Sequence, residues 1–387
     1  MKRGDTGIYT TTAVGGEQVR AFIPAPLPPK PSIDLQAIQA PLEAATLALG
    51  RLDALTLAAL LPETGLFLYY AVRKEAVLSS QIEGTQSSLS ELLLFEASPE
   101  VAAPLDDVVE VSNYVAALEH GLARLKAGFP LSNRLLREAH EVLLSRGRGS
   151  DKQPGEFRRS QNWIGGTRPG NAHFVPPPPH EVVTCMGDLE RFLHATDTQL
   201  PALVRAGVAH LQFETIHPFL DGNGRVGRLL ISLMLHHERV LAEPMLYLSL
   251  YFKQHRDRYY QHLDQVRETG DWEDWLTFFL DGVAATAQAA VATAQRLREL
   301  FAQDRERIQA MKGANSLLRV HRALQARPIT SVQEVCEREG MTFATASRGI
   351  AALESIGMVA ELTGFKRNRR FAYQDYLAIL REGTELE

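Results

Sequence analysis

The chain has 387 residues, of which 45% are hydrophobic and 22% charged, and its formal net charge is −5. This length allows two or three domains, and the composition is ordinary for a globular protein. The acidic balance excludes a protein that is basic overall, so any nucleic-acid surface would have to be local. Only two cysteines are present, Cys185 and Cys336, which excludes a disulfide-dense secreted scaffold and favours a reducing compartment.

The hydropathy pattern predicts neither a targeting segment nor a membrane span. The first residues, MKRGDTGIYTTTAVGGEQ, contain no apolar stretch of the kind found in a signal peptide. No window approaches the roughly 18 uninterrupted apolar residues that a spanning helix needs. We therefore expect a cytoplasmic protein that does not interact with a membrane.

Helices are predicted for most of the chain from apolar residues at helical spacing. Residues 1–33 are the exception, because the five prolines in FIPAPLPPKP favour extended chain. Between two helices, residues 155–181 hold two short apolar runs around a glycine-proline turn, which predicts a hairpin followed by a rigid proline stop. The predicted helices cover 34–55, 67–95 with a break near Gly84, 104–127, 132–146, 181–195, 201–213, 225–240 and nearly all of 256–311.

The last part of the chain has a different pattern. A charged helical connector is predicted near 302–315, followed by helices at 316–327, 331–339 and 342–356 and by two short strands around TGFKRN. Three helices and a hairpin are typical of the winged-helix variant of the helix-turn-helix. The expected fold class is therefore mainly α, with one hairpin in the middle of the chain and a winged helix near its end.

The most informative stretch is HPFLDGNGRVGRLL, residues 217–230. Gly222 and Gly224 let the backbone approach a ligand, and the helix that follows adds free N–H groups and a positive dipole end, which together suit phosphate. Arg225 and Arg228 lie three residues apart, so they share one helix face and can bind more than one phosphate. The stretch therefore predicts a phosphate-binding turn.

Two further residues of this stretch add reactive chemistry. Asp221 is a hard oxygen ligand that would hold Mg²⁺ beside bound phosphates, and His217 is the natural general base at neutral pH. A base, a metal-binding acid and a phosphate cradle predict phosphoryl or nucleotidyl transfer. The pattern is not a P-loop, because no Lys-Ser/Thr pair follows the glycines. Each residue taken singly is more often structural, so their joint occurrence carries the prediction.

HPFLDGNGRVGR resembles the Fic-domain motif HPFx(D/E)GNGRxxR at every fixed position. Three further segments, KEAVLSSQIEGTQSSL, RRSQNWIGG…FVPPPP and LYLSLYFKQHRDRYYQHL, are similar to bacterial Fic proteins with an N-terminal inhibitory helix and a C-terminal winged helix. The similarity spans about residues 5–375. It implies a Fic-fold helical core with a β-hairpin flap, arranged as an N-terminal extension with the inhibitory helix (1–100), a catalytic core (101–300) and a connector with the winged helix (301–387).

The resemblance implies protein adenylylation, in which AMP moves from ATP to a Ser, Thr or Tyr hydroxyl of a target protein or of the chain itself. It implies that His217 takes the proton from that hydroxyl and that Asp221 holds Mg²⁺ at the phosphates. A packing role stays open as an alternative for Tyr259 and Tyr260, because paired tyrosines on a helix are common packing residues. The implied ATP-binding residues are Glu83, His217, Gly222, Asn223, Gly224, Arg225, Val226, Gly227, Arg228, Tyr259 and Tyr260.

SSQIEGT resembles the inhibitory motif (S/T)xxxE(G/N) of the same family. Ser79 and Glu83 are four residues apart on one helix face, and Gly84 follows as a helix terminator. The implied mechanism is that Glu83 pairs with Arg228, occupies the space of the γ-phosphate and turns the α-phosphate out of line with the attacking hydroxyl. A competing role for Glu83 is to position a water that removes AMP from the modified protein, and the sequence leaves both roles open.

The predicted hairpin at 159–175 resembles the flap of the family. Its job would be strand addition, in which an extended target segment pairs with the flap edge and places its hydroxyl over the α-phosphate. Ile164 and His173 flank the turn and are the candidates for target contacts. The alternative is a hairpin that only covers the core.

A second class of function is a DNA-binding regulator whose core senses a nucleotide. In that hypothesis the third helix of the winged helix enters the major groove and the wing binds phosphate. Winged helices also serve in protein contacts, and the family often pairs its subunits, so a homodimer is expected. The wing cations and the polar residues near the start of the third helix are Lys366, Arg367, Arg369, Arg370, Thr342, Thr345, Ser347 and Arg348.

Overall fold

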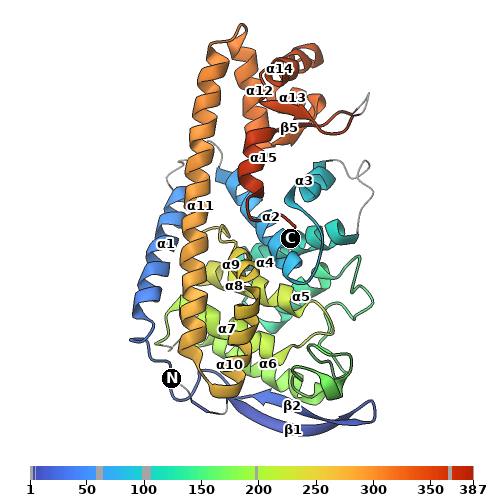
Figure 1. The fold of residues 1–387 in the computed structure, drawn as a ribbon, viewed down its shortest axis with the longest axis vertical. Coiled ribbons are helices and arrows are strands. Elements are labelled where there is room, and N and C mark those ends of the chain that lie inside the picture. Colours follow the sequence, from blue (N-terminus) through green and yellow to red (C-terminus); the bar gives the residue numbers. More distant parts are fainter. Residues whose placement is uncertain are drawn as a thin grey trace.

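The computed structural model describes residues 3–4, 6–57, 64–97, 106–196, 199–364 and 368–386 and is mainly helical (Figure 1). Lys366 and Arg367 of the predicted wing lie outside these ranges. The strands are β1 (Gly7–Val14), β2 (Glu17–Pro24), β3 (Ile329–Thr330), β4 (Val359–Glu361) and β5 (Phe371–Tyr373). The helices are α1 (Gln39–Leu57), α2 (Thr64–Ile82), α3 (Leu89–Ala97), α4 (Asp106–Lys126), α5 (Asn133–Leu143), α6 (Pro179–His194), α7 (Ala202–Ile216), α8 (Asn223–His237), α9 (Ser249–Gln254), α10 (Arg256–Thr269), α11 (Trp272–Gln309), α12 (Ala314–Ala326), α13 (Val332–Glu339), α14 (Phe343–Ser355) and α15 (Gln374–Arg381), with one 3-10 turn, η1 (Pro169–Asn171).

Helix α7 is the centre of the core. Every residue from Leu203 to Ile216 is buried, which is the pattern of a helix surrounded by neighbours on all sides. α6, α8, α10 and α11 pack around it. The indole nitrogen of Trp275 in α11 donates to the Gly207 carbonyl of α7 at 3.0 Å, so the two helices approach closely at that glycine. Because α7 is fixed in this way, the residue that ends it is also fixed.

Helix α11 runs along the whole molecule and connects the core to the C-terminal part of the chain, with α1 packed beside it (Figure 1). By length and composition it could cross a membrane, but 56% of its most apolar window is buried inside the protein. A core helix of a soluble protein meets the same criterion, so this helix is weak evidence for a span. It also runs unbroken across the predicted boundary at residues 300 and 301, and the domain limits stay predictions.

The C-terminal module, residues 314–373, contains α12, α13 and α14 at the predicted positions. Ser331 and Glu334 form a reciprocal capping box at the start of α13, and Gly340 ends that helix in the left-handed region with φ 58°. The small antiparallel sheet has the order β3-β5-β4. β3 and the helix α15 that follows β5 were not predicted from the sequence. The element order is that expected of a winged helix, and this identification stays a prediction.

The N-terminal residues form a β-hairpin, where the sequence predicted extended chain rich in polyproline. β1 and β2 pair antiparallel from Gly7 with Pro24 to Val14 with Glu17. The turn between them is Gly15-Gly16, with φ 57° and 85°, as a two-residue hairpin turn requires. The prolines begin only where β2 ends, so they stop the hairpin and do not prevent it.

The predicted flap hairpin is present in reduced form. Ile164 and Phe174 form one isolated antiparallel bridge, and η1 closes the turn between them. The flap rests on the N-terminal hairpin, because the Phe22 amide of β2 donates to the Val175 carbonyl at 2.9 Å and Glu17 pairs with Arg168. Two segments about 150 residues apart in sequence thus support each other.

Candidate active site

The predicted phosphate turn lies between α7 and α8 and is held by its own residues. His217 ends α7 in the left-handed region with φ 50°, and its amide donates to the Phe213 carbonyl at 2.9 Å. Gly222 precedes α8 with φ 77°, a conformation that favours glycine. The Asn223 side chain accepts from the Phe219 amide and donates to the Phe219 carbonyl, both at 2.8 Å. Asn223 therefore fixes the loop that presents the free amides of α8.

His217 is kept neutral by its surroundings. Burial is the main reason that its pKa is lowered to about 3, and the nearby cations Arg158 and Arg267 lower it further, while Glu83 opposes them. A neutral imidazole can accept a proton at physiological pH. Its Nδ1 atom is buried, and the nearby Glu214 backbone also opposes the lowering of the pKa. The imidazole is therefore in the neutral state that a general base requires.

Arg228 is bound by the residues of the predicted inhibitory motif. Its Nη2 atom lies 2.7 Å from Oε1 of Glu83 and 2.9 Å from the Ser79 carbonyl, and its Nε donates to Oγ of Ser79 at 2.8 Å. Burial alone would raise the pKa of Glu83, but the Arg228 guanidinium holds that pKa below its ordinary value. Glu83 is therefore an ionised partner, and together with Ser79 it occupies the Nε and Nη2 donors of Arg228.

Two glycines of the motif leave room for carboxylates. A Cβ atom at Gly224 would collide with Oε1 of Glu83, and a Cβ atom at Gly227 would collide with Oε1 of Glu214. Burial raises the pKa of Glu214 to about 7, and its Oε1 has no hydrogen-bond partner among the described residues. Gly224 therefore leaves the space in which Glu83 contacts Arg228. The sequence did not reveal that this position must lack a side chain.

A second set of contacts links Arg225 to the turn after α2. Its Nη1 atom lies 3.2 Å from Oε2 of Glu110 in α4, and both side chains are almost fully buried. The Thr85 hydroxyl donates to the same oxygen of Glu110 at 3.3 Å. Both motif arginines are thus connected to the turn after α2, Arg228 through Glu83 and Arg225 through Glu110 and Thr85. Glu110 and Thr85 were missed from the sequence.

Asp221 has the chemistry and the exposure of a magnesium ligand. Its Oδ1 accepts from the Gly222 amide at 2.6 Å and lies 3.6 Å from Nη2 of Arg225, and a third of its side chain is exposed. In the described residues no group of three or more His, Cys, Asp or Glu side chains could hold a metal. Mg²⁺ commonly binds through one or two carboxylates together with substrate phosphates. The residues present therefore fit an ion that arrives with a nucleotide.

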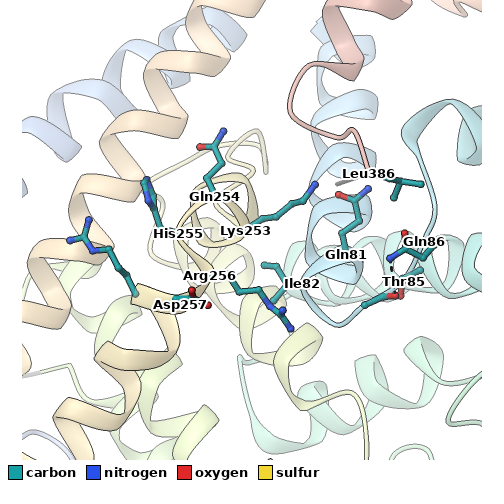
Figure 2. A pocket seen from close by; sticks show the side chains of 12 residues that line it. Gln81, Ile82, Thr85, Gln86, Lys253, Gln254, His255, Arg256, Asp257 and Leu386 are labelled. Atoms are coloured by element: carbon teal, nitrogen blue, oxygen red, sulfur yellow. Dashed lines mark hydrogen bonds between the residues drawn. The ribbon is translucent and has the colours of Figure 1, made fainter.

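The turn after α2, residues 83–87, is called the inhibitory turn below because it holds the predicted inhibitory residue Glu83. An open cavity of about 590 Å³ lies beside it (Figure 2). Its size is in the range of small-molecule sites. Neither His217 nor Arg228 lines it, so it adjoins the phosphate turn without containing it. The lining residues come from the end of α2, from the junction of α9 and α10, and from the C-terminal end of the chain: Gln81, Ile82, Gly84, Thr85, Gln86, Lys253, Gln254, His255, Arg256, Asp257, Arg258 and Leu386.

The comparisons with known proteins agree with this geometry. Residues 39–123 match the family model described as Fic/DOC family N-terminal, and residues 130–235 match the Fic/DOC family model. The chain contains a Fic N-terminal region and a Fic domain. Its Fic domain holds the whole phosphate turn and its Fic N-terminal region holds Ser79, Glu83 and Gly84.

Relatives of this Fic protein are found among insect proteins named protein adenylyltransferase Fic. The one from Culex quinquefasciatus is 34% identical over 205 residues, which is 52% of this chain and 38% of the relative. The one from Aedes aegypti is 38% identical over 128 residues, 33% of this chain and 23% of the relative. The matched region therefore spans well under half the length of these relatives.

Solved structures share the fold. A Fic family protein from Desulfovibrio desulfuricans G20 has a TM-score of 0.59 at 20% identity and covers 90% of this chain and 98% of its own. Fic-1 from C. elegans, residues 134–508, has a TM-score of 0.53 at 22% identity and covers 68% of this chain and 75% of its own. The Fic fold is thus seen in two distant proteins.

The two tyrosines expected near the nucleotide differ in their surroundings. Tyr259 is only 1% exposed, stacks on Phe252 and bonds its hydroxyl to Nε2 of His210 at 2.8 Å. Tyr260 is 36% exposed. The ionisation of both side chains is influenced by Glu83 and Arg228, so both lie near the inhibitory pair. Tyr259 is packed between Phe252 and His210, and Tyr260 is the one with a face toward solvent.

The flap residues are placed beside α10. Ile164 forms the bridge with Phe174, and Nε2 of His173 lies 2.6 Å from Oδ2 of Asp264. The Arg267 guanidinium lies 3.9 Å from the centroid of the Phe174 ring. The flap of this Fic protein is therefore anchored to α10 on one side and to the N-terminal hairpin on the other.

Arg158 is the most informative residue that the sequence analysis missed. It is 2% exposed and donates to main-chain carbonyls: Nε to His217 at 2.9 Å, Nη2 to Pro177 at 2.6 Å and to Ile216 at 3.4 Å. Its own amide donates to the Pro218 carbonyl at 2.9 Å. Arg158 therefore ties the left-handed turn at His217 to the end of the flap. It stands in the quoted segment RRSQNWIGG, but nothing in the spacing predicts this contact.

The described cations of the predicted wing are paired within the module. Nη1 of Arg370 lies 2.7 Å from Oε2 of Glu334, and Nε of Arg369 lies 4.0 Å from Oε2 of Glu361. Nε of Arg348 donates to the Ala344 carbonyl of its own helix at 3.1 Å. These contacts leave less unpaired positive charge than the sequence suggested for a DNA-binding face.

Proposed function

We propose that this chain is a protein adenylyltransferase that transfers AMP from ATP to a Ser, Thr or Tyr hydroxyl of a target protein or of itself, and that Glu83 holds it inactive. The observation that carries the proposal is the contact of Arg228 with Glu83 and Ser79 inside a complete Fic motif. The relatives named protein adenylyltransferase Fic support the reaction class.

The proposed chemistry assigns each step to a named atom. The target hydroxyl oxygen attacks the α-phosphorus of ATP, and the bond to the bridging oxygen breaks, so that pyrophosphate leaves. Neutral His217 accepts the hydroxyl proton. The amides at the start of α8 and the Arg225 guanidinium stabilise the charge on the phosphates. A Mg²⁺ held by Asp221 would supply further neutralisation of the phosphate charge.

Inhibition follows from competition for one guanidinium. In the proposed active state Arg228 binds the γ-phosphate, but Glu83 already occupies it at 2.7 Å. A hydrogen bond between charged groups contributes about 1.5–3 kcal/mol, or roughly a 10- to 150-fold preference for the bound state. ATP that enters beside Glu83 is therefore held with its α-phosphate out of line.

Two alternatives remain as proposals of lower rank. Glu83 could instead position a water that removes AMP from a modified protein, because its carboxylate lies close enough to His217 to affect that residue's pKa. DNA binding by the C-terminal module is less well supported, because Arg369 and Arg370 are paired internally. We also propose that the protein is cytoplasmic, which agrees with the free thiols of Cys185 and Cys336. We further propose that it forms a homodimer, and light scattering of the purified chain tests this assembly.

The reaction is tested with ATP labelled at either the α- or the γ-phosphate, using Glu83→Gly protein and Mg²⁺. Adenylyl transfer predicts protein-bound label from the α-labelled nucleotide alone. Label from the γ-position would indicate phosphoryl transfer, and no label from either position on the chain or on added cell protein would reject the proposal.

A further inference from the structure

A segment near the end of the chain returns to the inhibitory turn. α15 leads away from the C-terminal module and brings residues 382–386, called the tail segment below, onto the core beside α2 (Figure 1). Tyr376 of α15 packs edge-on against Tyr70 of α2, with ring centroids 5.6 Å apart. The tail segment therefore joins the C-terminal module to the helix that leads into Glu83.

Gln81 makes the contact that matters most. Its Nε2 donates to the Thr384 carbonyl of the tail segment at 3.0 Å and to the Ser87 carbonyl at 2.9 Å. Gln81 stands two residues before Glu83, and Ser87 stands four residues after it. One amide therefore links the tail segment, the last turn of α2 and the loop beyond Glu83.

Other contacts fix the tail segment along its length. Nζ of Lys74 donates to the Glu382 carbonyl at 2.7 Å, and the Glu382 carboxylate receives both Nη atoms of Arg296 at 2.6 and 2.7 Å. Nζ of Lys253 donates to the Glu385 carbonyl at 2.7 Å. Thr384 is 2% exposed. The tail segment is thus seated on α2, α9 and α11.

The tail segment also forms one wall of the cavity beside the inhibitory turn. Leu386 lines that cavity together with Gly84 and Thr85, and Figure 2 shows Leu386 and Gln81 on the same side of it. Gly383 lets the backbone come close to α9: its φ is 79°, and a Cβ atom there would lie 2.7 Å from Cδ1 of Leu250. A methyl group at this position would strain the left-handed backbone and displace the end of the Leu250 side chain.

We propose that the tail segment is a second restraint on the inhibitory turn, which holds Glu83 against Arg228 and through which the C-terminal module controls the active site. Its catalytic consequence rests on the function proposed above. Gln81 restrains both sides of Glu83, so release of the tail segment loosens the turn and lowers the population in which Arg228 is occupied. A ligand of the C-terminal module activates the core only if it binds better when α15 has moved.

The test compares two glycine substitutions. Gly383→Ala adds strain and a contact with Leu250, whereas Gly357→Ala adds similar strain, at φ 75°, with no described atom within 4 Å of the new methyl. We expect Gly383→Ala to accelerate amide hydrogen exchange at Glu83, Gly84 and Thr85 about fivefold, the factor that one net hydrogen bond is worth. We expect a similar rise in AMP transfer, and no change in either quantity for Gly357→Ala.

A chain that ends after Arg381 serves as a second variant and should behave as Gly383→Ala does. Unchanged exchange at residues 83–85 in both variants would overturn the proposal, and so would a fall in AMP transfer by folded protein. In a Glu83→Gly background, Gly383→Ala should give no further gain, because the restrained group is gone; a further fivefold gain there would also overturn it. If Glu83→Gly transfers no AMP, the proposed function fails, while the exchange measurement still decides whether the restraint exists.

Discussion

Nη2 of Arg228 lies 2.7 Å from Oε1 of Glu83, although the two residues are 145 positions apart in sequence. The contact is buried on the arginine side and is supported by two bonds from Arg228 to Ser79. Gly224 is the residue that lets the carboxylate come so close. Two of the three nitrogens in the guanidinium of the motif's final arginine are therefore bound by the protein itself.

The first prediction is that Glu83→Gly raises the initial rate of AMP transfer by roughly 10- to 150-fold, because the charged hydrogen bond to Arg228 is lost. The rate of label incorporation from α-labelled ATP measures this. Gln86→Gly is the matched control, since Gln86 is exposed three residues further along the same loop and contacts neither motif arginine. An equal gain in the control would show that loop loosening, and not the carboxylate, sets the rate.

His217→Ala is predicted to abolish transfer in the Glu83→Gly background, because no other described group in the turn is a neutral base. The pH profile gives a second check. Burial lowers the pKa of His217 to about 3, and removal of Glu83 takes away a charge that favours protonation. The rate of Glu83→Gly protein should therefore stay flat as the pH falls from about 7.5 to about 5. A rate that falls with a midpoint near 6.5 would indicate a solvated, ordinary histidine.

The same lowered pKa predicts how stability depends on pH. Below about pH 6.5 the unfolded chain binds a proton at His217 that the folded chain does not, so stability falls with pH toward about 3. His217→Ala should lower the slope of the free energy of unfolding against pH by up to about 1.4 kcal/mol per pH unit, because it removes the contribution of this histidine. Urea unfolding at several pH values between 4.5 and 6.5 measures the slope, and identical slopes for the two proteins would contradict the lowered pKa of this histidine.

Arg158→Met is predicted to lower the turnover number about 100-fold in the Glu83→Gly background, with little change in the KM for ATP. The reason is that Arg158 binds the carbonyls of His217, Ile216 and Pro177 and so positions the base. Arg158→Lys keeps the charge with fewer donors and should recover part of the rate. A rise in KM with unchanged turnover would instead place Arg158 at the nucleotide.

Asp221→Asn is predicted to raise the Mg²⁺ concentration needed for half-maximal transfer, because the amide removes the negative charge that attracts the cation. The loop itself should persist, since the amide oxygen can still accept from the Gly222 amide. A Mg²⁺ titration of transfer by the Glu83→Gly and the double-variant proteins measures the shift. Equal magnesium dependence in both would move the metal role away from Asp221.

The loop and helix start at residues 217–228 could be predicted from the sequence because their parts are contiguous, and their catalytic role stays a prediction. Residues 217–228 bring a base, an acid, glycines and arginines together within one loop and one helix start, so little tertiary information was needed. The helices were predicted for the same reason, from local apolar spacing. The contact of Glu83 with Arg228 was predicted only through the resemblance to the Fic family, because a helix end with a surface glutamate has no distinctive pattern.

What was missed depends on contacts between distant segments. Arg158 and Glu110 look like ordinary charged residues in the sequence, and only the fold brings them to His217 and Arg225. The return of α15 to α2 has no local signal either, because Gln81 and Thr384 are about 300 residues apart. The β1–β2 hairpin was missed for a different reason. Gly15-Gly16 was a local turn signal, but the nearby prolines favoured extended chain for the whole segment.

The most direct test of the account is intact-mass spectrometry of three proteins after incubation with ATP and Mg²⁺: the wild type, Glu83→Gly, and Glu83→Gly combined with His217→Ala. We expect a gain of one or more AMP groups on Glu83→Gly, little or none on the wild type, and none on the double variant. Equal AMP addition to the wild type and Glu83→Gly would contradict inhibition by Glu83. AMP addition to the double variant would contradict the role of His217.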